Sequence, residues 1–260
     1  MGDLGALVPF VVAIAAAVFV IWFVRYQLSL GRVTETLIDA EEALDRGDVA
    51  RARELAAPLL ARYPRLAVVQ DVAADVLYAN GDPLSAASLY ERAMKKLGAL
   101  RVAPKLVAAY AALNRAGDAR RVAALAPDDP MTRLALAWSE LAAVGGDRRN
   151  GNALADELAR DAQLRATAAG DAMADVLEAI AAARDGDSHR ARAALDRASA
   201  RREELAAHDR AFIAYLAGIA LLEMGAMADA RAMWTTAIDA APETIGSALA
   251  RRERSHLPAE

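Results

Sequence analysis

Residues 216–234 read LAGIALLEMGAMADARAMW, two alanine-rich helical patterns separated by a glycine. Gly218 lies inside the first pattern, whereas Gly225 lies between the two. Alanine is the best helix former, and its small side chain lets two helices approach closely. We therefore expect Gly218 and Ala230 to lie where two helices cross, because a bulky residue there would force the helices apart. We also expect Trp234 to pack under the next layer of helices.

The whole 260-residue chain has the composition of an all-helical protein. Hydrophobic residues make up 56% and aromatic residues only 5%, since alanine supplies much of the apolar content. No segment alternates apolar and polar residues with the period of a β-strand. The formal net charge is −4 and no basic block occurs, which argues against nucleic-acid binding. The absence of cysteine excludes disulfides, thiolate nucleophiles and cysteine zinc sites.

A helix–turn–helix unit recurs from about Thr34 onward. Each turn is centred on a glycine, which accepts the left-handed conformation that ends a helix. An aspartate often follows and caps the amides of the next helix. The turn glycines are Gly47, Gly81, Gly117, Gly146, Gly186 and Gly225, at intervals of 29 to 40 residues. This recurrence indicates a helical solenoid, and an ordinary helical bundle with alanine-rich seams is the alternative.

The spacing within the units resembles the tetratricopeptide repeat. That family has a small residue midway along the first helix, a turn glycine, and small and large apolar residues at fixed positions of the second helix. The stretch quoted above fits through Gly218, Gly225, Ala230, Trp234, Ala237 and Pro242. The second unit fits through Ala74, Gly81, Ala86, Tyr90 and Ala93. The resemblance covers most of residues 34–243, strongly in three units and loosely in the others.

These patterns predict an all-α fold, a right-handed α-solenoid of stacked antiparallel helix pairs preceded by one transmembrane helix. Residues 1–32 would form a membrane anchor and juxtamembrane segment, residues 33–243 about six repeat units, and residues 244–260 a capping helix and polar tail. The third and fourth units depart from the repeat pattern. Residues 126–130 (APDDP) shorten one helix, and residues 145–152 (GGDRRNGN) form an inserted loop.

The predicted anchor is LGALVPFVVAIAAAVFVIWFV, residues 4–24, which carries no charge. At about 1.5 Å per residue, a helix of this length spans about 30 Å, the thickness of the hydrocarbon core of a bilayer. A cleaved signal peptide is the alternative. Against it, the preceding residues MGD contain no lysine or arginine, and no small-residue cleavage site follows Val24.

The charges beside this segment favour one orientation. Arg25 and Arg32 flank its C-terminal end, and Asp3 is the only charged side chain before it. The positive-inside rule then places the repeat domain in the cytoplasm, with a periplasmic domain as the alternative. The excess of arginine over lysine suggests a bacterial source, and hence the inner membrane. The layout is similar to that of lipopolysaccharide assembly protein B, but the metal-binding cysteines of that family are missing here.

No residue pattern points to catalysis, a cofactor or a metal. The three histidines, His189, His208 and His256, are too far apart in sequence to form a helix-borne metal pair. Residues 185–189 (DGDSH) resemble the start of a calcium loop, but the required later glycine and glutamate are absent. No phosphate-binding loop or nucleophile elbow occurs. We therefore expect a protein that is not an enzyme.

The resemblance implies a concave groove lined by the first helix of each unit, which accepts an extended or helical peptide. The corresponding positions are Leu37, Glu41, Leu44, Asp71, Asp75, Tyr78, Val107, Asn114, Val176, Ile180, Phe212, Tyr215, Ile219 and Glu223. Asp71 and Asp75 would repel a terminal carboxylate, so an apolar or basic peptide is expected. Phe212 and Tyr215 are either its anchors or core residues that cover the last layer.

The sequence thus predicts a membrane-anchored scaffold that mediates protein–protein interactions at the bacterial inner membrane, assembling or recruiting a complex. Protein partners would bind the concave surface, and residues 4–24 would contact the lipid bilayer. The alternative is a periplasm-facing, chaperone-like or translocon-associated protein. A catalytic repeat protein would need a cluster of titratable side chains, which the sequence does not indicate.

Overall fold

The structure is a computed structural model that describes residues 31–143 and 145–257, and over these ranges it is helical without any strand. A first helix covers residues 31–45. It is followed by α2 (Val49–Arg62), α3 (Ala67–Ala79), α4 (Pro83–Leu97), α5 (Ala99–Ala112), α6 (Ala116–Ala123), α7 (Pro130–Ala142), α8 (Arg148–Leu158), α9 (Ala168–Arg184), α10 (Ser188–Ala200), α11 (Ala207–Glu223), α12 (Met227–Ala240) and α13 (Ile245–His256). Two short 3-10 helices, η1 (Leu164–Ala166) and η2 (Arg202–Glu204), precede α9 and α11. The all-α prediction is confirmed.

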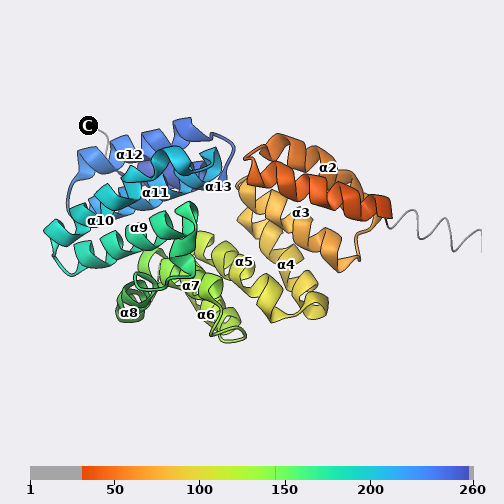
Figure 1. The fold of residues 1–260 in the computed structure, drawn as a ribbon, viewed down its shortest axis with the longest axis horizontal. Coiled ribbons are helices and arrows are strands. Elements are labelled where there is room, and N and C mark those ends of the chain that lie inside the picture. Colours follow the sequence, from red (N-terminus) through yellow and green to blue (C-terminus); the bar gives the residue numbers. More distant parts are fainter. Residues whose placement is uncertain (1–30, 144, 258–260) are drawn as a thin grey trace, which may run out of the picture.

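The helices pack in successive pairs. α3 packs against α4, α5 against α6, α7 against α8, α9 against α10, and α11 against α12. Contacts of α4 with α5, of α5 with α7 and of α9 with α11 join neighbouring pairs. Figure 1 shows the pairs following one another along an arc from α2 to α12, with α13 lying between α11 and the first pairs.

The turns within the second and fifth pairs use the predicted glycine and aspartate. Gly81 has a φ of 80° and Gly186 a φ of 81°, in the left-handed region that favours glycine. Asp82 then accepts a hydrogen bond from the amide of Ser85 at 3.1 Å, and Asp187 accepts one from the amide of Arg190 at 2.9 Å. A local sequence signal therefore determines where these helices end and begin.

Two turn predictions were wrong. Gly117 lies inside α6, and the left-handed residue of the third pair is Asn114, with a φ of 57°. Asparagine tolerates this conformation better than other residues with a side chain, so it replaces glycine there. In the fourth pair the left-handed residue is Gly145 rather than Gly146. The inserted loop predicted over residues 145–152 is also mostly helical, because α8 begins at Arg148, with Asp147 as its capping residue.

Gly218 and Trp234 form the contact between α11 and α12. A Cβ atom on Gly218 would lie 2.2 Å from the Nε1 atom of Trp234, so only glycine fits there. The indole is fully buried, and its N–H donates a hydrogen bond of 3.0 Å to the carbonyl oxygen of Tyr215 in α11. The predicted close approach is confirmed, but Trp234 occupies the crossing within its own pair.

Carboxylates that are buried or partly buried tie several pairs together. Glu140 of α7 is 1% exposed and accepts hydrogen bonds of 2.6 and 2.8 Å from the guanidinium of Arg120 in α6. It also accepts one of 2.5 Å from the amide of Asp147, which orders the turn before α8. Arg184 of α9 donates a 2.7 Å hydrogen bond to Glu223 of α11. Removing Arg120 would leave the charge of buried Glu140 without this partner, the kind of loss that costs about 3–5 kcal/mol.

Within the described residues, no helix is long and apolar enough to cross a bilayer. The predicted span over residues 4–24 lies outside them.

The Gly218 contact generates a stability prediction. Gly218→Ala should lower the free energy of unfolding by about 1–3 kcal/mol, because the added methyl group displaces the indole of Trp234. This loss runs against helix propensity, which favours alanine over glycine by about 1 kcal/mol. Gly117→Ala is the matched control, since a Cβ atom there has no neighbour within 4 Å. Urea unfolding should show the control at or above wild-type stability, and equal stability of Gly218→Ala would contradict the prediction.

Candidate functional site

The positions predicted to line a concave groove are largely taken up by helix packing. Seven are buried, namely Leu37, Asp71, Val107, Val176, Ile180, Tyr215 and Ile219. Seven are partly buried, namely Glu41, Leu44, Asp75, Tyr78, Asn114, Phe212 and Glu223. The buried side chains pack against other helices of the chain.

The structure brings together predicted groove residues from distant units. Tyr78 of α3 packs against the core cluster that contains Tyr215 of α11. The ring of Phe212 meets that of Trp138 edge-on at 4.9 Å between centroids and lies 6.0 Å from that of Tyr215. Burial raises the pKa of the phenol groups of both Tyr78 and Tyr215. These contacts favour the interpretation of Phe212 and Tyr215 as core residues.

The carboxylates of Asp71 and Asp75 in the second helix pair are paired with basic side chains of the third pair. Asp71 is fully buried and accepts hydrogen bonds from Arg101 at 2.8 Å and from Lys105 at 3.1 Å, both in α5. Asp75 accepts one of 2.6 Å from Lys105 and one of 2.7 Å from the hydroxyl of Tyr90. These hydrogen bonds link α3 to α5, and little of the field of the two carboxylates is left to attract a basic peptide.

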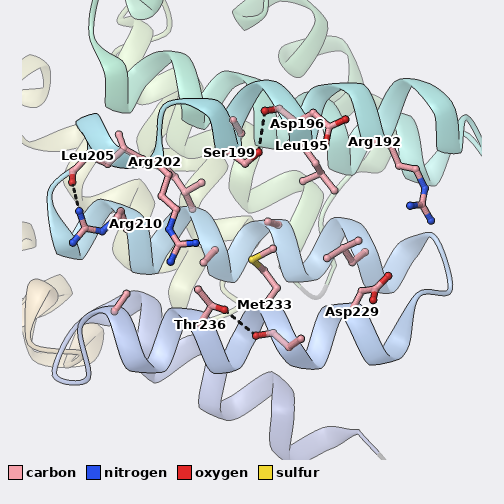
Figure 2. A pocket seen from close by; sticks show the side chains of 17 residues that line it. Arg192, Leu195, Asp196, Ser199, Arg202, Leu205, Arg210, Asp229, Met233 and Thr236 are labelled. Carbon is pink, nitrogen blue, oxygen red and sulfur yellow. Dashed lines mark hydrogen bonds between the residues drawn. The ribbon is translucent and has the colours of Figure 1, made fainter.

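An open groove of about 510 Å³ lies instead between α10 and α12, as Figure 2 shows. Its floor is formed by side chains of α11 that keep only 7–8% of their surface exposed. The apolar lining consists of Leu195 and Ala198 from α10, Leu205 before α11, Ile213, Ala214, Ala217 and Leu221 from α11, and Ala232, Met233 and Ala240 from α12. The space exists because α10 packs mainly on α9 and barely touches α11, while the floor side chains Ala214 and Ala217 are small.

Charged side chains stand at both ends of this groove. Arg202 and Arg210 lie at one end, and Arg192 and Asp229 at the other (Figure 2). Arg210 donates a hydrogen bond of 2.8 Å to the carbonyl oxygen of Leu205. Among the residues that the structure describes, Arg192 and Arg202 have no ion pair. An apolar floor between charged ends suits an amphipathic polypeptide segment.

The two hydroxyl groups that line the groove already donate hydrogen bonds within their own helices. Ser199 donates to the carbonyl of Asp196 at 2.9 Å, and Thr236 to that of Ala232 at 3.1 Å, so both hydroxyls cap their own helices' carbonyls. In the described part of the chain, no group of three or more histidine, aspartate or glutamate side chains is placed to hold a metal ion.

The sequence did not reveal this groove. Its walls are second helices, whereas the family resemblance directs attention to first helices. The available signal was the pair of small residues Ala214 and Ala217 on one side of α11. Comparison with protein-family models and with curated proteins found no match, so the geometry of the chain carries the functional argument.

Asp75 generates a pH prediction. Burial raises the pKa of its carboxyl group, an effect that Lys105 partly opposes. The contribution of Asp75 to stability is therefore fully present below about pH 4, the pKa of an unfolded aspartate, and is lost as the pH rises through the raised pKa. Asp75→Asn removes this ionisation. Urea unfolding should show the variant gaining stability relative to wild type as the pH rises through this range.

The same substitution at the exposed residue Asp39 is the control for this experiment. A stability difference between Asp75→Asn and wild type that stayed constant over the acid range would contradict the prediction.

Proposed function

We propose that the chain is a membrane-anchored helical-repeat scaffold that binds protein partners. The observation that carries this proposal is the open groove between α10 and α12, whose floor and walls are apolar and whose ends are charged. An amphipathic helix or an extended segment would bury its apolar side on α11 and place its polar groups near the arginines at the ends. Such a surface recognises polypeptide without performing chemistry.

The finer architecture that we propose is an α-solenoid of tetratricopeptide type. It is supported by the successive pairing of helices, the contacts from each pair to the next, and the small residues at the Gly218–Trp234 crossing. In this type of fold each pair buries its apolar face only against its neighbours, so the stack offers long open surfaces between layers.

The proposed location is the bacterial inner membrane, with the helical domain in the cytoplasm. The uncharged segment over residues 4–24 and the arginines that follow it support this proposal. The alternative is a periplasm-facing protein that holds translocated substrates. The role of the groove is the same in both cases, but the partners differ.

Photo-crosslinking tests the groove. A photoreactive side chain at Thr236 of the full chain in cells should give adducts with discrete partner proteins. The same group at Arg53, which is exposed on α2 away from the groove, should not give those adducts. Ala232→Trp should fill the groove and reduce the Thr236 adducts at least about tenfold, equivalent to about 1.4 kcal/mol of binding free energy.

Ala228→Trp is the matched control, because this exposed residue of α12 does not line the groove. If both tryptophan variants left the Thr236 adducts unchanged, the proposed binding surface would be wrong.

A pair of C-terminal fusions tests the orientation. A fused green fluorescent protein should fluoresce, and a fused alkaline phosphatase, which is active only after export, should be inactive, because Arg25 and Arg32 retain the following domain in the cytoplasm. Active phosphatase with a dark fluorescent protein would support the periplasmic alternative. Recovery of the intact chain in the soluble fraction without detergent would exclude the anchor.

A further inference from the structure

The C-terminal helix α13 lies in a seat built by α11 and α12. Ile245, Gly246, Ser247, Leu249 and Ala250 are the buried residues of this helix. The hydroxyl of Ser247 lies 2.8 Å from the carbonyl oxygen of Ala237 and 2.6 Å from that of Ala241. These carbonyl groups lie at the C-terminal end of α12, where no further turn of the helix supplies amide donors for them. α13 therefore supplies a hydrogen-bond donor to the end of α12.

Gly246 brings the backbones of α13 and α11 into direct contact. A Cβ atom on this residue would lie 2.5 Å from the backbone nitrogen of Phe212 and 2.6 Å from the backbone carbon of Ala211. Backbone atoms cannot move aside as a flexible side chain can. The seat therefore selects a helix with glycine at this position and excludes larger residues.

The opposite side of α13 meets the beginning of the domain. A Cβ atom on Gly81, at the turn between α3 and α4, would be 3.2 Å from the Cβ atom of Ala248. Arg252 donates a hydrogen bond of 2.9 Å from Nη1 to the carbonyl oxygen of Ala112, the last residue of α5, which is 140 positions earlier in the chain. A cation at the C-terminal end of a helix is stabilising. α13 thus fills the space between the last pair and the second and third pairs.

Residues 242–243 of the connection to α12 are exposed, whereas Thr244 is buried. α13 follows the last helix pair and packs through Ile245, Leu249 and Ala250 into the core cluster that contains Trp234. Its departure would uncover an apolar and hydrogen-bonding surface shaped for a helix. A second helix with the same features would find the same contacts there.

We propose that the seat of α13, formed by α11, α12 and the turn at Gly81, is a helix-binding site that the chain's own C-terminal helix fills in cis and an equivalent helix can fill in trans. The ligand is a short amphipathic helix with glycine and serine at adjacent positions, alanine one turn later and arginine six positions after the glycine. α13 is then an autoinhibitory occupant. This site is separate from the groove between α10 and α12, so either can fail without the other.

The test uses the full chain in detergent micelles and a fluorescein-labelled peptide of residues 243–257. Gly246→Leu in the protein should expel α13 from its seat while leaving the seat intact. Fluorescence anisotropy should then show the variant binding the peptide at least about tenfold more tightly than wild type does. Hydrogen exchange should rise over residues 245–256 of the variant.

Two controls match the substitution. Gly117→Leu in the protein changes the same residue type where an added Cβ atom has no neighbour within 4 Å, and it should bind the peptide no better than wild type. A peptide that itself carries Gly246→Leu should not bind the Gly246→Leu protein, because its leucine would meet the backbone of Phe212.

Ala248→Arg provides a second route if Gly246→Leu does not fold. It displaces α13 through the turn at Gly81 without altering the contact with α11, and it should also increase peptide binding. The proposal is overturned if a folded variant with α13 released binds the peptide no more tightly than wild type, or if the leucine peptide binds equally well.

Discussion

Close contact between helices through residues with little or no side chain is the constraint on which this structure depends. At the crossing of α11 and α12, Gly218 leaves room for the indole of Trp234, which then reaches a backbone carbonyl of the facing helix. At the crossing of α11 and α13, Gly246 lets two backbones touch. In both places one missing Cβ atom sets the distance between helices. The high alanine content of the chain extends the same principle to the other pairs.

Ion pairs connect one helix pair to the next. Glu140, Asp71 and Asp75 are covered by helices, and each is satisfied by arginine or lysine from a neighbouring pair. Such pairs add little net stability compared with apolar packing, but an unmatched one is costly, so they disfavour wrong registers of stacking. The apolar groove between α10 and α12 stands out against this background, because its arginines at the ends lack such partners within the described residues.

Local features of the fold could be predicted from the sequence, and features set by distant contacts could not. The turns at Gly81 and Gly186 were predicted because the glycine and the capping aspartate act within a few residues. The turn at Asn114 was missed because asparagine adopts the left-handed conformation without the glycine signal. Groove positions taken from repeat register are buried by neighbouring pairs, as Leu37 and Val107 are, or by the last pair, as Tyr78 is, and these contacts are a property of the whole stack. The open groove depends on α10 packing on α9 with little contact to α11, a placement that no short pattern encodes.

The hydrogen bond from Arg252 to Ala112 joins groups 140 positions apart, and this has a consequence for biosynthesis. Each helix pair can form as soon as it leaves the ribosome, since its contacts are with neighbours in sequence. The second and third pairs, however, wait for their last contact until α13, the latest of the described helices, has been translated. During that interval the turn at Gly81 and the end of α5 are uncovered on the nascent chain. The period in which a chaperone or a partner subunit can reach them is therefore set by the speed of translation.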